Sequence, residues 1–388
     1  MPMGNIDARF TSLLVFYFLY RFVDVGFRSI IVYYAYEVVH SVWGSALAVA
    51  MATLGSGVGL LIVGLYALYV IRPQVLMLVF MAFRGVLILT LMFLGSTADH
   101  LTVLLAMLLT YSVALWLERS ILGGIAVENV PSIARGLNAL NLAFQLGGLA
   151  MTALLVVFLR IGATAFGILA LLQFALMTIL GSLLLSRRVG LKVTIPRRAA
   201  SRTAFSGDAV TLYAMTFIHN ISISILLSIA PSFGALLYAI FYVVSEVSSI
   251  AGRVIFMVIG DRVVLSGRLF LYGTLLGLAL TLITYIYREP LAMIIGITSL
   301  NALSAAGTVF TGNALRYVLA DAIYNVRILS TVSSLFGALY GSLILLTPTP
   351  GAVLIATFLA IASAFPTLHH KVVRIGMEIM HRKKPQSQ

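Results

Sequence analysis

Charged side chains inside long apolar stretches are the residues of this sequence that could do chemistry. Asp24 lies three residues after Arg21 and four before Arg28, so one helix face would carry an acid between two bases. A charge at the centre of a bilayer costs about 2.5 to 3.5 kcal/mol even on lenient insertion scales, so such a face must point away from lipid. This spacing predicts an inward-facing ion cluster.

Three more charges of the first half lie within apolar stretches. Glu118 and Arg119 are adjacent, and neighbouring residues of a helix point about 100° apart, so only one of them can face the same space as Asp24. We expect Arg84 to turn towards Asp24 or Glu118 as a structural partner. For the whole network the structural alternative is an ion-pair staple between helices.

The second half places His219 and Asn220 in one apolar stretch and Glu246 in the next, at similar depth. Burial favours the neutral form of a carboxyl, which is what a proton-coupling acid needs. Our hypothesis is that Glu246 or Glu118 takes up and releases a proton, while the arginines of the first half attract a substrate or stabilise charged acids. For His219 we favour the simpler interpretation of a hydrogen-bonded interior histidine.

Composition decides which elements must position these groups. Of the 388 residues 61% are hydrophobic and only 10% are charged, against roughly a quarter charged in soluble domains. A bilayer span needs about 20 apolar residues, so we predict an all-α integral membrane protein with about twelve transmembrane helices. The expected spans are 10–36, 43–70, 75–96, 101–126, 132–158, 162–186, 209–230, 233–259, 269–287, 291–315, 327–346 and 351–369.

The basic residues orient these spans, because positively charged loops stay cytoplasmic. On this division the outer side keeps only Arg160 and Arg288. The 17 inner basic residues are Arg9, Arg72, Arg135, Arg187, Arg188, Lys192, Arg197, Arg198, Arg202, Arg262, Arg268, Arg327, Lys371, Arg374, Arg382, Lys383 and Lys384. We therefore expect a multi-pass cell-membrane protein with both termini cytoplasmic, and no nucleic-acid partner despite the net charge of +13.

The predicted domains follow from one long polar segment between the sixth and seventh spans. An N-terminal six-helix bundle covers 1–186, a basic cytoplasmic linker 187–208, a C-terminal six-helix bundle 209–370 and a basic cytoplasmic tail 371–388. Arg135 and Arg327 open the fifth and eleventh spans 192 residues apart and are followed by similar small or aliphatic residues. This pattern favours an internal duplication.

Several short motifs lie within the predicted spans or in the loops that join them. Pro131 and Arg135 flank the start of the fifth span, and Arg119 precedes Gly123 in the fourth. The loop between the eighth and ninth spans carries Asp261, Arg262, Gly267 and Arg268. An Asp at a helix end can accept from the N-terminal amides of a neighbouring helix and hold a gate closed. The alternative is that these charges only anchor the loops at the inner surface.

With twelve spans, a basic linker and repeated halves, these motifs resemble the major facilitator superfamily over essentially the whole chain. The match is partial: Leu122 stands where the family usually has Gln, and three extra residues separate Arg262 from Gly267. The resemblance implies a divergent member with two pseudo-symmetric six-helix bundles. It places Asp24 and Arg28 beside Glu118 or Arg119 around a central cavity. It also implies a gating role for Arg135, Asp261, Arg262, Gly267 and Arg268.

We therefore expect a secondary active transporter that moves a small solute by alternating access, coupled to an ion and specifically to a proton. The aromatic residues near the cavity favour efflux of small amphiphilic compounds: Tyr17, Tyr20, Phe22, Phe241 and Tyr242. Four mid-span arginines against three acids favour an anionic or zwitterionic solute, so an importer of an organic anion stays open.

The other alternative is a receptor or scaffold that transports nothing. An enzyme is not expected, because the buried acids and His219 are too dispersed to form a nucleophile and base or a metal site. The glycines 55–59 are followed by no Lys-Ser or Lys-Thr pair, so no phosphate-binding loop is present. We expect no cofactor, a monomer, and the solute, the coupling ion and the lipid bilayer as partners.

Overall fold

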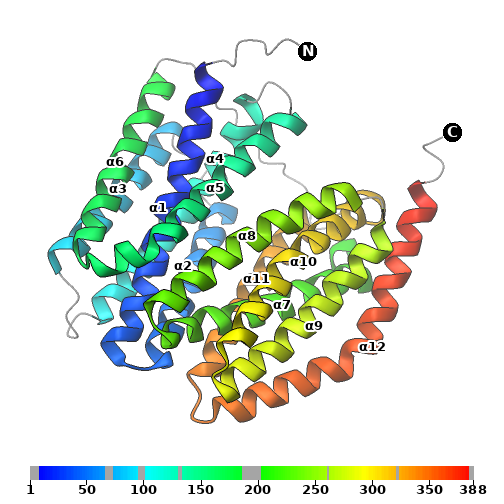
Figure 1. The fold of residues 1–388 in the computed structure, drawn as a ribbon. Helices are drawn as coiled ribbons and strands as arrows, with labels where there is room; N and C mark the ends of the chain where they lie inside the picture. Colours follow the sequence, from blue (N-terminus) through cyan, green and yellow to red (C-terminus); the bar gives the residue numbers. More distant parts are fainter. Residues whose placement is uncertain are drawn as a thin grey trace. The chain divides into compact units, whose positions relative to one another are not determined.

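The computed structural model describes residues 8–65, 73–94, 101–129, 133–185, 202–259, 262–319 and 323–383. Within these ranges the chain forms twelve α-helices long and apolar enough to cross a membrane, and no strand (Figure 1). The predicted all-α membrane fold is confirmed. The chain divides into two compact units, Met1–Gly44 with Met51–Pro196 and Ser45–Ala50 with Arg197–Gln388.

The first six helices lie in the first half of the chain. Their bounds are α1 Ala8–Val39, α2 Val42–Leu65, α3 Pro73–Leu94, α4 Leu101–Asn129, α5 Ile133–Arg160 and α6 Thr164–Leu185. In the first unit α1 packs against α4, α5 and α6, and α3 packs against α4 and α6. The Gln173 side chain of α6 donates to the Met81 carbonyl of α3 (3.1 Å), which fixes the depth of α3. α1 is thus the helix around which this unit is built.

The second unit repeats this helix pairing. Its elements are η2 Arg202–Phe205, α7 Gly207–Ile229, η3 Ala230–Phe233, α8 Ala235–Ile259, α9 Val263–Tyr287, α10 Pro290–Tyr317, α11 Ile323–Leu345 and α12 Pro350–Lys383. α7 packs against α11 as α1 packs against α5, and α10 packs against α8 and α9. Two serines strengthen the α7–α11 seam, since Ser224 donates to the Ala338 carbonyl and Ser333 to the Tyr213 carbonyl.

Glycines allow the paired helices of both units to touch backbone to backbone. A Cβ at Gly147 of α5 would lie 2.0 Å from the Phe18 carbonyl oxygen of α1. A Cβ at Gly337 of α11 would lie 2.2 Å from the Phe217 carbonyl oxygen of α7. Small residues at helix contacts are the usual means of close approach in membranes, where lipid supplies no hydrophobic driving force. The same device at corresponding helices supports the pseudo-symmetry of the two units.

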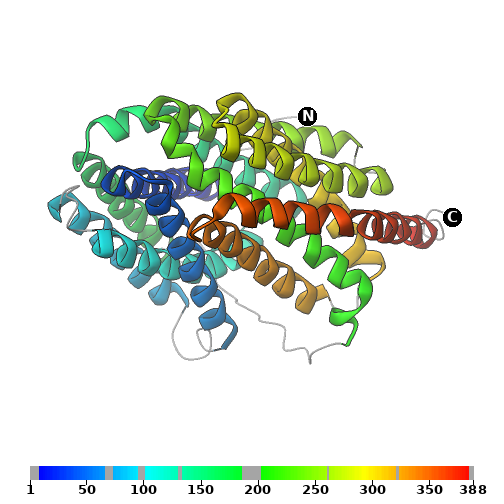
Figure 2. The same cartoon turned by 90° about the horizontal axis from the view of Figure 1, so that it is seen from below.

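The last helix is longer than a bilayer requires. α12 has 34 residues, or about 51 Å at 1.5 Å per residue, against a hydrocarbon thickness of about 30 Å. It continues as one helix past Pro366, as both ribbon views show (Figures 1 and 2). Within the predicted tail, Val372, Ile375 and Ile379 have no exposed surface and join a cluster with α7, α9 and α10. The described part of the tail is therefore the packed end of α12.

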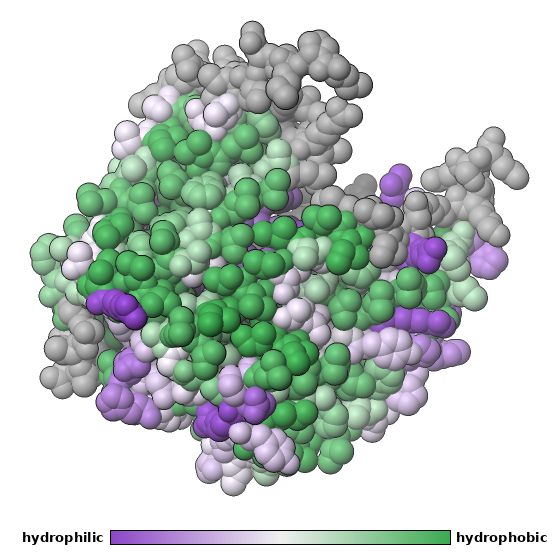
Figure 3. Space-filling view, in the orientation of Figure 1, coloured by the Kyte–Doolittle hydropathy of each residue, from purple (hydrophilic) through white to green (hydrophobic). Residues whose placement is uncertain are grey.

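Hydrophobic side chains dominate the face seen in Figure 3, and hydrophilic ones gather at its lower edge and right-hand side. Large apolar residues are widely exposed, among them Phe93 (77%) and Leu171 (72%). In water such a surface would drive aggregation, whereas in lipid it costs nothing. The exposed surface is thus that of a chain embedded in a bilayer.

The glycine contacts generate a stability prediction. Gly337→Ala should lower the thermal stability of the detergent-purified protein, because the new Cβ would overlap the Phe217 carbonyl; overpacking costs about 1 to 3 kcal/mol. Gly312→Ala is the matched control, since nothing lies within 4 Å of its Cβ position. There the change should be neutral or stabilising, because Ala favours a helix by about 1 kcal/mol over Gly. Equal melting temperatures for the two variants would contradict the close α7–α11 contact.

Candidate functional site

Two partly exposed arginines interrupt a buried stretch of α1, the central helix of the first unit. Between Tyr20 and Val32 every residue of α1 is buried except Arg21 and Arg28, which lie two turns apart on one face. Asp24 lies between them with no exposed surface. The Arg21 guanidinium contacts Asp24 at 3.2 Å and that of Arg28 at 3.0 Å, so the acid holds both bases on its own helix.

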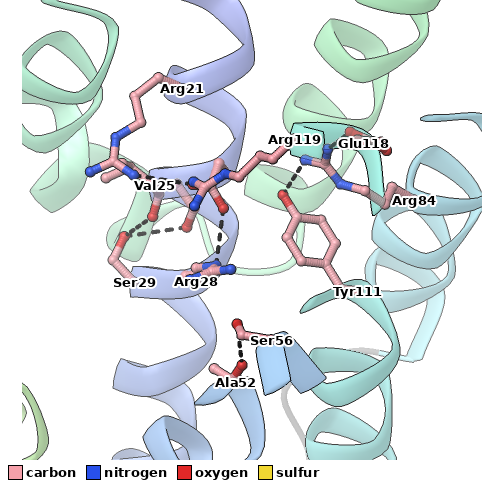
Figure 4. Close-up of polar contacts among 12 residues, drawn as sticks. Arg21, Val25, Arg28, Ser29, Ala52, Ser56, Arg84, Tyr111, Glu118 and Arg119 are labelled. Atoms are coloured by element: carbon pink, nitrogen blue, oxygen red, sulfur yellow. Dashed lines mark hydrogen bonds and ion pairs between the residues drawn. The ribbon is translucent and has the colours of Figure 1, made fainter. Parts of the chain in front are cut away.

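A third arginine reaches the same carboxylate from α4. Nη2 of Arg119 donates to Oδ2 of Asp24 at 2.7 Å (Figure 4). We call Arg21, Asp24, Arg28 and Arg119 the Asp24 cluster. The Tyr17 hydroxyl of α1 donates to the Leu122 carbonyl of α4 (3.0 Å), and Leu122 lies one helical turn after Arg119. This contact sets the rotation of α4 about its axis, so that Arg119 points towards α1.

The neighbouring residue on α4 points elsewhere. Glu118 forms an ion pair with Arg84 of α3, and both side chains have no exposed surface. Arg84 also donates to the Tyr111 hydroxyl at 2.5 Å and lies over the rings of Tyr111 and Tyr20. The expected partnership of Arg84 with Glu118 is therefore present, and Arg119 rather than Glu118 faces Asp24.

Two contributors to these clusters escaped the sequence reasoning. Tyr111 lies seven residues before Glu118, which puts both on one face of α4, and that spacing could have indicated it. The Phe144 ring of α5 lies 5.1 Å from the Arg21 guanidinium carbon and 5.9 Å from that of Arg119. Nothing in the sequence marks Phe144, because its role depends on how α5 packs against α1.

The second-unit candidates occupy separate surroundings. His219 is 7% exposed and packs at 5.1 Å against the Phe270 ring of α9, and its Nδ1 atom has no hydrogen bond within the described residues. Asn220 donates to the Thr216 carbonyl of its own helix (2.8 Å). Glu246 is 9% exposed on α8. Among the described residues no group of three His, Cys, Asp or Glu could share a metal ion.

The predicted gating residues are only partly described. Asp261 and the side chain of Arg135 lie outside the described residues. Arg262 is exposed and caps the start of α9, where its carbonyl accepts from the Ser266 amide (3.0 Å). Gly267 is buried, and a Cβ there would lie 2.7 Å from the Phe310 ring, so packing alone accounts for this glycine. Arg268 is exposed, and a gating role for these residues stays a prediction.

The Arg84–Glu118 pair yields a second stability prediction. Removing one member of a buried pair costs about 3 to 5 kcal/mol because an uncompensated charge is left behind. A carboxyl can bind a proton, whereas a guanidinium keeps its charge in proteins. Glu118→Gln should therefore destabilise the protein more than Arg84→Gln.

Chemical denaturation of the purified protein in detergent measures both variants. The double variant Arg84→Gln/Glu118→Gln is the control, because it leaves neither charge unmatched and should be more stable than Glu118→Gln alone. A double variant as unstable as the sum of the single variants would mean that the two side chains do not act as a pair.

The comparisons with known proteins locate this architecture among solved structures. No protein-family model and no curated protein matches the sequence. A mutant of the nucleoside transporter NupG superposes with a TM-score of 0.68 at 12% identity, covering 96% of this chain and 99% of that one. A mutant of the peptide transporter POT gives 0.66 at 15% identity, covering 95% and 94%.

A POT family transporter in complex with a thioalcohol-conjugated peptide also superposes, with a TM-score of 0.63 at 13% identity and coverage of 98% and 96%. These three solved structures are thus transporters rather than enzymes. Since the likeness extends over nearly the whole of each chain, the protein has the same twelve-helix fold as these transporters, in agreement with the fold that its resemblance to the major facilitator superfamily implied.

Proposed function

We propose that the protein is a secondary active transporter that moves a small solute across a membrane by alternating access, with the Asp24 cluster as part of its substrate site. One observation supports this most directly. Arg21, Arg28 and Arg119 keep 26%, 28% and 28% of their side chains exposed, although the carboxylate that they share is fully buried. The first two lie within the apolar span Phe10–Val39, and Arg119 ends the apolar span Leu101–Arg119. Charged side chains that keep exposed surface within a membrane span need water or a ligand beside them.

A scaffold is the weaker explanation of this arrangement. The Arg84–Glu118 pair has the form expected of a purely structural contact, because both side chains are fully buried and bound to each other. In the Asp24 cluster one buried carboxylate contacts three arginines whose side chains are partly exposed. A scaffold that binds no solute has no need of partly exposed charge within the span region.

Coupling to a proton is part of the proposal. Glu118 is fully buried against Arg84, so a change in its protonation would require that pair to break. Glu246 lies mid-span in the other unit, and its neighbour Ser245 accepts from Asn301 of α10 (2.9 Å), which ties this turn of α8 to α10. We therefore assign the coupling carboxyl to Glu246.

The basic ends of the helices support cytoplasmic termini.

The aromatic residues that favoured an amphiphilic solute give little support to that substrate. Tyr20 and Phe241 have no exposed surface, and Tyr17 and Phe22 are each 8% exposed. Rings buried to this extent pack helices together and leave little surface for a solute. The polar cluster on α1 and α4 is the stronger guide to the substrate.

Alternating access can be tested directly because the chain contains no cysteine. Phe144→Cys, beside the Asp24 cluster, should react with a membrane-impermeant maleimide from the outer side in right-side-out vesicles and from the inner side in inverted ones. Arg160→Cys, at the exposed end of α5, is the control and should react from the outer side only. Labelling of Phe144→Cys from a single side would refute alternating access.

The coupling proposal has its own test in proteoliposomes. Glu246→Gln should abolish uptake driven by a pH gradient while leaving exchange of solute across the membrane in place, because a neutral amide can still permit rocking but cannot carry a proton. The control is Glu289→Gln, at the exposed start of α10. Unaltered pH-driven uptake by Glu246→Gln would remove this residue from the coupling role.

A further inference from the structure

The outward face of α12 changes in character along the helix. Exposed residues recur there every three or four positions, so they form one continuous stripe. We call this stripe the outer stripe of α12, and its residues are Leu359, Ser363, Thr367, His370, Arg374 and Met377. The opposite face packs against α7, α9 and α10 through Val372, Ile375 and Ile379. The outer stripe therefore faces away from the second unit (Figure 1).

Distance along the helix places the two ends of this stripe in different surroundings. α12 begins at Pro350, directly after the exposed Pro348 and Thr349, so its crossing of the bilayer starts there. At 1.5 Å per residue, Leu359 lies about 14 Å from this start, His370 about 30 Å and Arg374 about 36 Å. The hydrocarbon is about 30 Å thick, and each headgroup layer adds roughly 5 to 8 Å. Leu359 thus lies among acyl chains, and His370 and Arg374 lie at the level of headgroups.

The side chains at the headgroup level suit a lipid phosphate. His370 and Arg374 are one helical turn apart on the same face. Nη2 of Arg374 donates to Oδ1 of Asp208 on α7, yet 57% of the Arg374 side chain stays exposed. A guanidinium has five N–H groups, so this ion pair leaves donors for the oxygens of a phosphate group.

The direction of these side chains also fits a lipid. In an α-helix the Cβ atoms tilt towards the N-terminus, and the N-terminal part of α12 is the part within the bilayer. Arg374 and the 50% exposed Met377 therefore lean back towards the membrane. Basic and apolar side chains on one exposed helix face are typical of a helix at a lipid interface.

The acids described near this end of α12 already have basic partners. Asp208 contacts Arg374, and Glu378 accepts from Arg382 at 2.5 Å. Arg382 also donates to the Tyr317 carbonyl at the end of α10 (2.8 Å), which holds the end of α12 against the unit. The exposed side of a helix end fixed in this way offers a partner basic groups in a constant arrangement.

From these observations we infer that the end of α12 binds an anionic phospholipid of the surrounding leaflet, with His370 and Arg374 on its phosphate group. Asp208 is a positioning residue, because its carboxylate holds Arg374 against α7. The inference is independent of the proposed transport function, since a protein that moves no solute can bind a lipid.

Thermal unfolding of the purified full-length protein in an uncharged detergent tests the inference, because a ligand stabilises the state that binds it. Phosphatidylglycerol added to the micelles should raise the melting temperature saturably, and phosphatidylcholine should do so only at a much higher mole fraction. Equal stabilisation by the two lipids would overturn the inference. An equal effect of inorganic phosphate would also overturn it, because the site would then be one for a soluble anion.

Two variants separate lipid binding from the ion pair itself. Arg374→Gln should need about fivefold more phosphatidylglycerol for the same shift, which is the effect of one basic residue near an anionic surface. Asp208→Asn breaks the same pair but keeps the arginine, so it should need no more lipid than the wild type. The lipid-free melting curve of each variant shows whether it is folded.

Arg160→Gln is the matched control, because it removes the same charge from an exposed helix end of the other unit and should leave the lipid effect unchanged. Equal lipid effects in Arg374→Gln and Asp208→Asn would mean that Arg374 only holds α12 in place, and the inference would fail.

Spin labels test the depth of the stripe, since the chain contains no cysteine of its own. A nitroxide on Met377→Cys in phosphatidylglycerol–phosphatidylcholine liposomes should show the shallow depth of the headgroup layer. The control is Leu359→Cys, which is 60% exposed on the same stripe and should lie deep in the hydrocarbon. A Met377→Cys label as open to a water-soluble nickel chelate as a label in bulk water would place the end of α12 beyond the headgroups and contradict the inference.

Discussion

Asp24 is the carboxylate on which three arginines of the first unit depend. In hydrocarbon a guanidinium keeps its charge, so each of these arginines needs an acid, a ligand or water within reach. Sharing Asp24 requires α1 and α4 to lie close together at one depth, and the Tyr17 contact with the Leu122 carbonyl fixes α4 in that position. The other residues of α1 between Tyr20 and Val32 are buried, because α1 packs against α4, α5 and α6.

The Arg84–Glu118 pair differs from this cluster, because here a buried guanidinium has a carboxylate to itself. It has one acid for one base, a tyrosine hydroxyl as a further acceptor and no exposed surface. The two arrangements use adjacent residues of α4, yet one is closed and the other open. This contrast, more than the presence of buried charge, is the reason for proposing the Asp24 cluster and not the Arg84–Glu118 pair as part of a substrate site.

Much of the architecture could be predicted from the sequence, because run length and hydropathy are local properties. The twelve spans and the inward charges belong to this class. The choice between Glu118 and Arg119 could not be predicted, since it depends on the rotation of α4 about its axis. The helical end of α12 was missed for a related reason: its residues are polar on average, and the packing of Val372 and Ile375 against other helices holds them helical. The close contact of Gly267 with the Phe310 ring could not be predicted either, because it depends on how α9 packs against α10.

The glycine contacts bear on how far such a fold can diverge. Gly147 and Gly337 each approach a backbone carbonyl of the partner helix, and a carbonyl is present whatever side chain that position carries. Only one residue of each contact is therefore constrained, and the partner can mutate freely while the helices stay at the same distance. A chain built on such one-sided contacts can lose nearly all recognisable similarity and keep its architecture, as identities of 12% to 15% over nearly complete chains illustrate.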